Sequence, residues 1–307
     1  MRFLAVFVAM AALLSVSAAK DELQVADLVK QNLNSIGTEQ ARAAVKSRAT
    51  EGTVSFLVEN SNSGRQDGKE VFVSDGDKFV SLLKLPNPNY HGERFVSDGK
   101  KTLITQVKPG AWSRLGDFVM VHNEILTEGL WGGTLSTGWA LAHLDERLAK
   151  LQDRGLKKVN GRDLRRVDYS PKKHSDLEIQ LYFEPDTFRH VMTVYSLTVR
   201  AQMGTSDIAT ARQEDTRYRL EERFADFKSF DGLTLPQRWT IEFTFENGAG
   251  AMADAQNLTA TQPAAGGIIP IGAAGVGAGN SPVSHFEVTI TNISNNVQLD
   301  PKNFEVK

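Results

Sequence analysis

The sequence predicts an α+β fold made mainly of antiparallel strands. Apolar residues recur with helical spacing only near the start of the chain and around its centre. From Glu51 onward most runs alternate between apolar and polar residues, and short turns such as Asp98-Gly99 separate them. Short connections of this kind join antiparallel neighbours, so we expect one meandering sheet.

Two helices are predicted over residues 21–47. Apolar residues such as Leu23 and Leu33 share one face of the first helix, which Gly37 should end. Thr38 then begins a second helix that should run through Val45, because threonine is a good N-cap residue.

A third helix is predicted over residues 139–152. Its apolar face would carry four leucines at helical spacing, and Gly155 would close it. These leucines are Leu141, Leu144, Leu148 and Leu151. The preceding residues 110–135 show no regular period.

The later strands alternate cleanly, which predicts one buried face and one solvated face. They are expected at residues 176–184, 188–199, 218–227, 237–246 and 285–291. Asn160-Gly161 predicts a tight hairpin before them.

Residues 1–19 have the pattern of a secretory signal peptide. Arg2 precedes an apolar run, and small residues before Lys20 form a cleavage site after Ala19. The alternative is a retained anchor, but the run is shorter than the roughly 20 residues of a membrane span, and charges follow at once. We therefore expect an exported, periplasmic protein without a transmembrane span.

Residues 20–307 are expected to form one domain. The Gly/Ala-rich stretch at 247–282 joins two well-marked strands, which predicts an insertion within that domain. The chain contains no cysteine, which excludes disulfides and thiol catalysis.

The motifs of common catalytic and cofactor sites are missing from the sequence. The six histidines are scattered without an H-E-x-x-H pattern, and no G-x-S-x-G occurs. The glycines at 275–279 are not followed by a helical pattern, so no nucleotide site is expected. A net charge of −2 does not indicate nucleic-acid binding. We predict a protein with no cofactor, no metal and no catalytic residue.

Two charged regions have alternative interpretations. Glu221, Glu222 and Asp226 alternate with arginines on one predicted strand, which favours a solvated, salt-bridged face over a pair of catalytic carboxylates. A basic hairpin follows the centre of the chain, and it either contacts lipid head groups or an acidic partner, or simply discourages aggregation. Its candidate contact residues are Lys157, Lys158, Arg162, Arg165 and Arg166.

The order of these parts resembles the LolA-like superfamily of bacterial envelope proteins. The resemblance covers residues 21–246 and 283–307, and two motifs carry it: residues 224–236, a Phe-Ala-Asp-Phe sequence leading to Leu-Pro, and residues 297–304 at the end of the chain. It implies a strongly curved half-barrel sheet whose concave face is covered by helices, with an apolar cavity between them for acyl chains. Carriers of this family latch a lid with an arginine, for which the sequence offers no assignment here. The insertion at 247–282 departs from the family pattern.

Two functions are therefore expected as alternatives. The first is non-catalytic binding of a lipid, or of the acyl chains of a lipoprotein, in an apolar cavity. Its candidate lining residues are Phe56, Ile179, Leu181, Trp239, Ile241, Phe243, Phe286 and Val288, with Trp131 and Trp139 in a lid. The second is an interaction or sensor module of the envelope, in which the core is filled and a protein partner binds outside.

Overall fold

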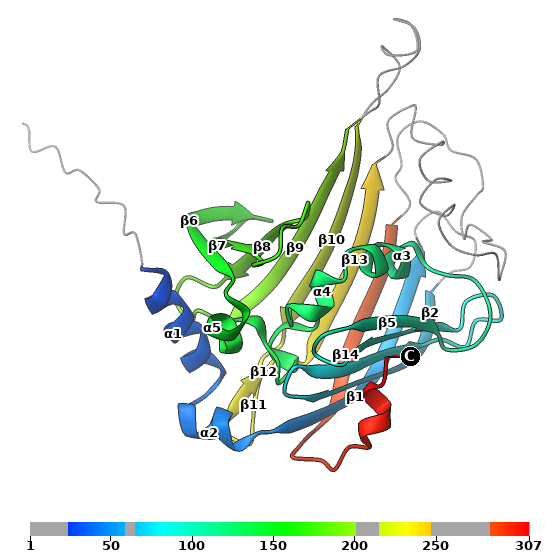
Figure 1. Cartoon of the computed structure of the whole chain (residues 1–307), viewed down its shortest axis with the longest axis horizontal. Coiled ribbons are helices and arrows are strands. Elements are labelled where there is room, and N and C mark those ends of the chain that lie inside the picture. Colours follow the sequence, from blue (N-terminus) through cyan, green and yellow to red (C-terminus); the bar gives the residue numbers. More distant parts are fainter. Residues whose placement is uncertain (1–23, 59–64, 201–214, 247–282, 307) are drawn as a thin grey trace, which may run out of the picture.

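A single curved sheet of 12 strands organises the protein in the computed structural model (Figure 1). The structure describes residues 24–58, 65–200, 215–246 and 283–306. The expected signal peptide at 1–19 and the expected insertion at 247–282 lie outside these residues. The strand order is β5-β4-β3-β2-β1-β14-β13-β10-β9-β8-β7-β6, and each neighbouring pair is antiparallel. The two edge strands, β5 and β6, leave the sheet open.

The elements have the following bounds. The helices are α1 (Val25–Ile36), α2 (Glu39–Ala44), α3 (Arg114–Val121), α4 (Glu124–Thr127) and α5 (Leu144–Arg147), with 3-10 turns η1 (Gly133–Leu135), η2 (Ala140–His143) and η3 (Pro301–Phe304). The sheet contains β1 (Ser47–Val58), β2 (Arg65–Asp75), β3 (Lys78–Lys84), β4 (Gly92–Ser97), β5 (Thr102–Gln106), β6 (Lys150–Val159), β7 (Arg162–Ser170), β8 (Glu178–Phe183), β9 (His190–Val199), β10 (Thr216–Ala225), β13 (Arg238–Glu246) and β14 (Val283–Asn295). A separate hairpin joins β11 (Lys228–Phe230) and β12 (Leu233–Leu235).

The predicted fold class is confirmed: the protein is α+β, with antiparallel strands in one open, curved sheet and helices over its concave face (Figure 1). The two N-terminal helices form where the sequence predicts them. The Thr38 hydroxyl accepts a hydrogen bond from the Ala41 N–H at 3.1 Å and so caps α2. Asn160 and Gly161 both have positive φ in the turn between β6 and β7, as a type I′ hairpin requires.

The predicted third helix over residues 139–152 is wrong. Only η2 and α5 are helical there, and Leu148 adopts a left-handed conformation with φ 55° that ends α5. Residues from Lys150 onward pair with β7, so Gly155 lies within an irregularity of β6 and not at a helix end. Strand pairing within the β6–β7 hairpin has overridden the local spacing of leucines.

Alternation of side chains divides the sheet into two differently covered faces. The concave face carries most of the apolar core, including the rings of Phe72, Phe95 and Trp239. The convex face is covered in part by the C-terminal turn η3, whose Phe304 packs on Val80 and Val96. The candidate functional site therefore lies between the concave face and the helical segment that covers it.

Candidate functional site

Residues 112–147, called the central segment here, cover the middle of the concave face. The segment contains α3, α4, η1, η2 and α5 and contributes no strand to the sheet. Its Trp131 ring lies 5.3 Å from the ring of Trp239 on β13 and 4.9 Å from that of Phe95 on β4. The segment thus touches both halves of the curved sheet through one buried tryptophan.

The eight residues predicted to line a cavity all face the covered interior. None is more than 4% exposed, and all belong to the main apolar core. Six of them lie on the adjacent strands β1, β14 and β13, where the rings of Phe56 and Phe286 are 4.6 Å apart. Ile179 and Leu181 lie on β8, separated from the others by β9 and β10. In this conformation they belong to one packed core, in which the Phe243 ring lies 5.1 Å from the ring of Phe118 in the central segment.

The two tryptophans predicted for a lid both belong to the central segment. Trp131 is fully buried and Trp139 is nearly so. The Trp139 indole N–H donates to the Asn32 side-chain oxygen on α1 at 3.1 Å. Trp139 also lies against the buried ring of His190, with ring centroids 4.5 Å apart. These contacts fix the segment to α1 and β9 as well as to the middle of the sheet.

A buried glutamate on β10 accepts hydrogen bonds from the central segment. Glu222 Oε1 accepts from the Gly132 N–H at 2.8 Å and from the Trp239 indole N–H at 3.0 Å, and Oε2 accepts from the Tyr195 hydroxyl at 2.8 Å. Burial raises the pKa of Glu222 to about 7, although its three donors favour the charged form. Because none of these donors carries a charge, their hydrogen bonds offset only part of the free-energy cost of removing the charged carboxylate from water.

A second buried glutamate holds the start of α3. Glu93 on β4 accepts from the Ser113 N–H and from the Ser113 hydroxyl, both at 2.7 Å. The same hydroxyl accepts from the Gly116 N–H at 2.9 Å and thereby caps α3. Burial raises the pKa of Glu93 to about 7. The first turn of the central segment therefore depends on a carboxyl beneath it.

An arginine on β1 holds the middle of the central segment. Arg48 Nη1 donates to the carbonyl oxygens of Thr134 at 3.0 Å and Leu135 at 3.1 Å, while Nε donates to the Asn295 side-chain oxygen. The guanidinium is only 4% exposed, and burial lowers its pKa to about 10. A buried cation that binds backbone carbonyls can hold this segment without forming an ion pair.

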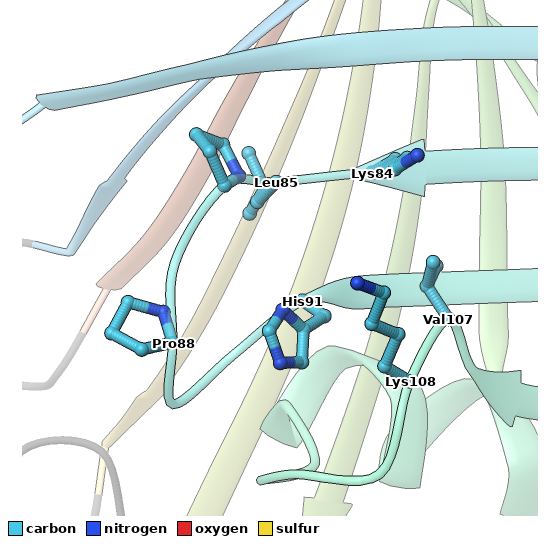
Figure 2. Close-up of a pocket in the computed structure, with 7 residues that line it drawn as sticks. Lys84, Leu85, Pro88, His91, Val107 and Lys108 are labelled. Carbon is cyan, nitrogen blue, oxygen red and sulfur yellow. The ribbon is translucent and has the colours of Figure 1, made fainter.

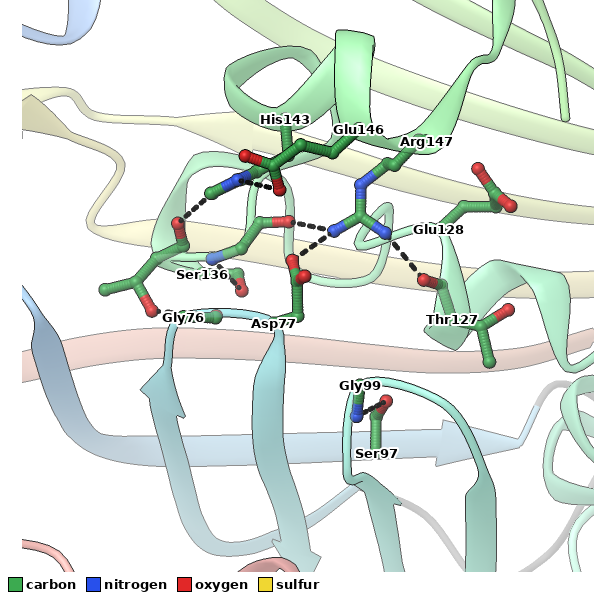
Figure 3. Close-up of polar contacts among 12 residues, drawn as sticks. Gly76, Asp77, Ser97, Gly99, Thr127, Glu128, Ser136, His143, Glu146 and Arg147 are labelled. Atoms are coloured by element: carbon green, nitrogen blue, oxygen red, sulfur yellow. Dashed lines mark hydrogen bonds and ion pairs between the residues drawn. The ribbon is translucent and has the colours of Figure 1, made fainter. Parts of the chain in front are cut away.

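The outer end of the central segment is held by a second arginine (Figure 3). Arg147 donates to Asp77 Oδ1 in the turn between β2 and β3 at 2.6 Å. It also donates to the carbonyl oxygens of Thr127 at 2.7 Å and Gly138 at 3.1 Å. The Thr137 N–H donates to the Ser74 hydroxyl at 3.0 Å, close to the same turn. Side chains, and not strand pairing, therefore attach this end to the sheet.

Several buried polar atoms of the central segment and of the sheet have no hydrogen-bond partner among the described residues. They include Glu70 Oε2, the Trp131 indole nitrogen, the Thr134 hydroxyl and His190 Nδ1. Burial also raises the pKa of Glu70 to about 8. An unsatisfied buried polar group costs about 1–3 kcal/mol, so this packing is not fully stabilised.

The basic hairpin of β6 and β7 carries its arginines in ion pairs. Arg162 pairs with Glu184 at 3.0 Å, Arg165 with Asp153 at 3.2 Å, and Arg166 with Asp168 at 2.7 Å. Lys157 and Lys158 have no ion pair among the described residues. The compensated arginines leave these two lysines as the uncompensated charges of the predicted contact surface.

Sequence patterns did not single out Arg48 or Glu93, and they placed Glu222 on a solvated face. The structure corrects the last prediction: Glu221 faces the charged side, whereas Glu222 is fully buried. The sequence does contain a sign of this burial, because alternate residues of a strand point to the same face and Glu222 alternates with Leu220 and Phe224, which face the core. Arg48 shares the parity of Val54 and Phe56 in the same way.

The described residues show neither a metal centre nor a membrane span. Within them, no three histidine, aspartate or glutamate side chains come together to hold a metal ion. No described helix combines the length and the apolar character that crossing a membrane requires.

Comparison with known proteins gives similarity of fold. No known family model matches the chain, and no curated protein matches it. Among solved structures, the chain is similar to a LolA superfamily protein from Nitrosomonas europaea, with 11% identity, a TM-score of 0.44, and coverage of 92% of this chain and 97% of that chain. It is also similar to a DUF1329 family protein from Desulfovibrio piger, with 12% identity, a TM-score of 0.43 and the same coverage of both chains. These similarities concern the fold alone.

Proposed function

We propose that the protein is a non-catalytic binder of an acyl chain, from a lipid or a lipoprotein, and that the central segment acts as its lid. One observation carries this proposal: the apolar middle of the sheet is covered by a segment that side chains hold in place and that pairs with no strand. Such a cover can move aside while the sheet stays intact. Trp131 and Trp139 then occupy, in the closed form, the space that the ligand takes.

The free energy gained by burying a ligand chain is comparable to the free energy lost when the central segment exposes its apolar side chains. Each methylene removed from water contributes about 0.8 kcal/mol, so a chain of about sixteen carbons contributes about 13 kcal/mol. Exposing a large apolar side chain of the central segment costs about 1.5–3 kcal/mol. A ligand chain can therefore offset the exposure of the two tryptophans and several neighbouring apolar residues.

A reversible crosslink tests whether the central segment must move. A Cβ atom added at Gly138 would lie 2.7 Å from the Gly76 carbonyl oxygen and 3.0 Å from the Asp77 Cα, so cysteines at positions 77 and 138 reach disulfide distance once the turn between β2 and β3 moves outward to admit the new side chain. The natural chain has no cysteine, so the pair Asp77→Cys and Gly138→Cys introduces the protein's only thiols. We expect the reduced variant to bind palmitoyl-lysophosphatidylcholine, measured by native mass spectrometry and tryptophan fluorescence, and the oxidised variant not to bind it.

A matched control separates locking of the lid from oxidation itself. A Cβ atom at Gly99 would lie 3.3 Å from the Asp77 Cβ, and both positions belong to turns of the sheet. The pair Asp77→Cys and Gly99→Cys therefore closes a disulfide that leaves the central segment free. Oxidation of this control should leave lipid binding unchanged, whereas equal binding by both oxidised variants would contradict the proposal.

A second candidate function is an envelope interaction or sensor module with a filled core. It is favoured by the burial of all eight predicted lining residues. Two pockets of the described residues, one beside Lys84 and His91 and one beside Phe304, are lined by none of the eight. Protein recovered from membranes without bound lipid, together with failure of the reduced variants to bind lipid, would favour this alternative.

We also propose that the chain is exported to the periplasm and that residues 20–307 act as one domain with an insertion at 247–282. The signal-like residues 1–19 support export. The direct pairing of β13 with β14 on either side of the insertion supports a single domain. The intact mass of protein isolated from the envelope should correspond to a chain that begins at Lys20.

A further inference from the structure

A pocket lies at the corner of the sheet, away from the two tryptophans of the central segment. It has a volume of about 370 Å³ and opens where β3 ends, where β4 begins and just beyond β5 (Figure 2). Its basic residues are Lys84, His91 and Lys108, and Pro86, Pro88 and Val107 supply apolar wall. The volume falls within the roughly 300–1,000 Å³ of small-molecule sites.

Backbone contacts hold the walls of this pocket in place. The Leu85 N–H donates to the His91 carbonyl at 3.0 Å and closes the loop that carries both prolines. The Ala111 N–H donates to the Asn89 carbonyl at 2.9 Å and joins that loop to the segment carrying Lys108. Because proline also fixes its own φ, the pocket needs little ordering when a ligand enters.

Positive charge at the pocket has no compensating acid. Neither Lys84 nor Lys108 forms an ion pair among the described residues, and no acidic side chain lines the pocket. Lys69 of β2 lies directly opposite Lys84 in the strand register, and both lysines are exposed. Like charges directly opposite each other on neighbouring strands are destabilising, and a bound anion would relieve this repulsion.

We propose that this pocket binds a phosphate group, either of a soluble phosphate ester or of an anionic phospholipid head group. The lysines supply charge and N–H donors, and the His91 ring, which lies beside the Lys108 side chain in Figure 2, adds a ring nitrogen. The two prolines and Val107 contact the apolar part that adjoins the phosphate. This site is independent of the central segment, so it stands or fails separately from acyl-chain binding.

The test compares charge removal at the pocket with equal charge removal in the turn between β4 and β5, at the opposite ends of these two strands. The variant Lys84→Gln with Lys108→Gln removes two charges from the pocket, and the control Lys100→Gln with Lys101→Gln removes two exposed charges from that turn. Calorimetry with inorganic phosphate and with glycerol 3-phosphate is run at constant ionic strength. Flotation uses vesicles of phosphatidylglycerol and phosphatidylcholine in equal parts, beside vesicles of phosphatidylcholine alone.

We expect the pocket variant to bind phosphate about tenfold or more weakly and the control with the two changed turn lysines to bind like the natural protein. Without phosphate the pocket variant should unfold at the same midpoint as the natural protein, which excludes loss of folding, and added phosphate should raise the midpoint of the natural protein alone. Vesicle flotation that depends on the pocket lysines assigns the site to a lipid head group, whereas phosphate binding without flotation assigns it to a soluble ester. Absence of phosphate and vesicle binding by the natural protein, or equal loss in both variants, would overturn the proposal.

Discussion

Two adjacent glutamates on β10 lie in different electrostatic environments. Glu221 lies on the convex face, where the guanidinium groups of Arg219 and Arg223 pair with it. Glu222 lies on the concave face, where Gly132, Tyr195 and Trp239 provide uncharged donors. Both side chains are largely buried. The nature of the partner, and not burial alone, therefore distinguishes the two carboxyls.

The same contrast extends over the whole sheet. On the convex face Arg223 also pairs with Glu242 at 3.1 Å. On the concave face Glu70 and Glu93 are buried without a cation partner, and burial raises both of their pKa values. The convex face is stabilised by compensated charges, whereas the concave face holds carboxyls whose pKa values burial raises, and two of them, Glu93 and Glu222, accept hydrogen bonds from the central segment.

The largest effect is expected when Glu222 is removed. Glu222→Ala leaves three buried donors unsatisfied, so we expect a loss of about 3–5 kcal/mol in the free energy of unfolding. Chemical denaturation measures it, with Glu221→Ala as the matched control one residue away. An equal loss in both variants would contradict the distinction between the two faces.

Stability should also depend on pH through the concave carboxyls. Folding raises the pKa values of Glu222 and Glu93 from 4.5 to about 7, so the folded state binds more protons than the unfolded state between these values. The free energy of unfolding therefore falls as pH rises from 4.5 to 7, by about 3 kcal/mol for each carboxyl. Denaturation at a series of pH values measures this slope, and Glu222→Gln should remove the part due to that residue. An unchanged slope in this variant would show that Glu222 is not responsible.

A local effect is expected when the inner arginine is replaced. Arg48→Met removes the donors to the carbonyls of Thr134 and Leu135, which should favour opening of the central segment by about 2 kcal/mol. Amide exchange in residues 132–138 should accelerate about thirtyfold, while exchange in β13 and β14 should change little. In Arg48→Lys, which keeps the charge, the exchange rate of these amides should lie between the rate in the natural protein and the rate in Arg48→Met. Uniform acceleration throughout the protein would indicate a general loss of stability.

The smallest effect is expected on the convex face. The side chain of Arg219 is 48% exposed, so its pairing with Glu221 is screened by water. We expect Arg219→Gln to change the free energy of unfolding by less than about 1 kcal/mol, and the change should shrink at high salt. A loss as large as that of Glu222→Ala would remove the contrast between the faces.

Strand alternation predicted much of this fold because the buried face of each strand is local information. Trp239, Ile241 and Phe243 were placed on one face from their spacing, and all three are buried. The helix expected over residues 139–152 failed because its last residues pair with β7, a contact that local spacing cannot reveal. The fold class could therefore be predicted from the sequence, while the boundary between α5 and β6 could not.

The candidate site was only partly accessible from the sequence. Trp131 and Trp139 could be associated with a cover, but their partners on β13, β4 and α1 are far away in the chain. Arg48 and Glu222 share the parity of apolar neighbours on their strands, which is the sequence sign of a charged group on a buried face. Their acceptors and donors in the central segment depend on folding and could not be read from spacing.

Amide exchange with and without palmitoyl-lysophosphatidylcholine tests the moving cover most directly. Bound lipid should accelerate exchange of the Gly132 amide, which is bonded to Glu222, and of residues 129–141 around it. The strands β1, β13 and β14 should keep their protection. Lipid binding that leaves the Gly132 amide as protected as in the free protein would contradict the account.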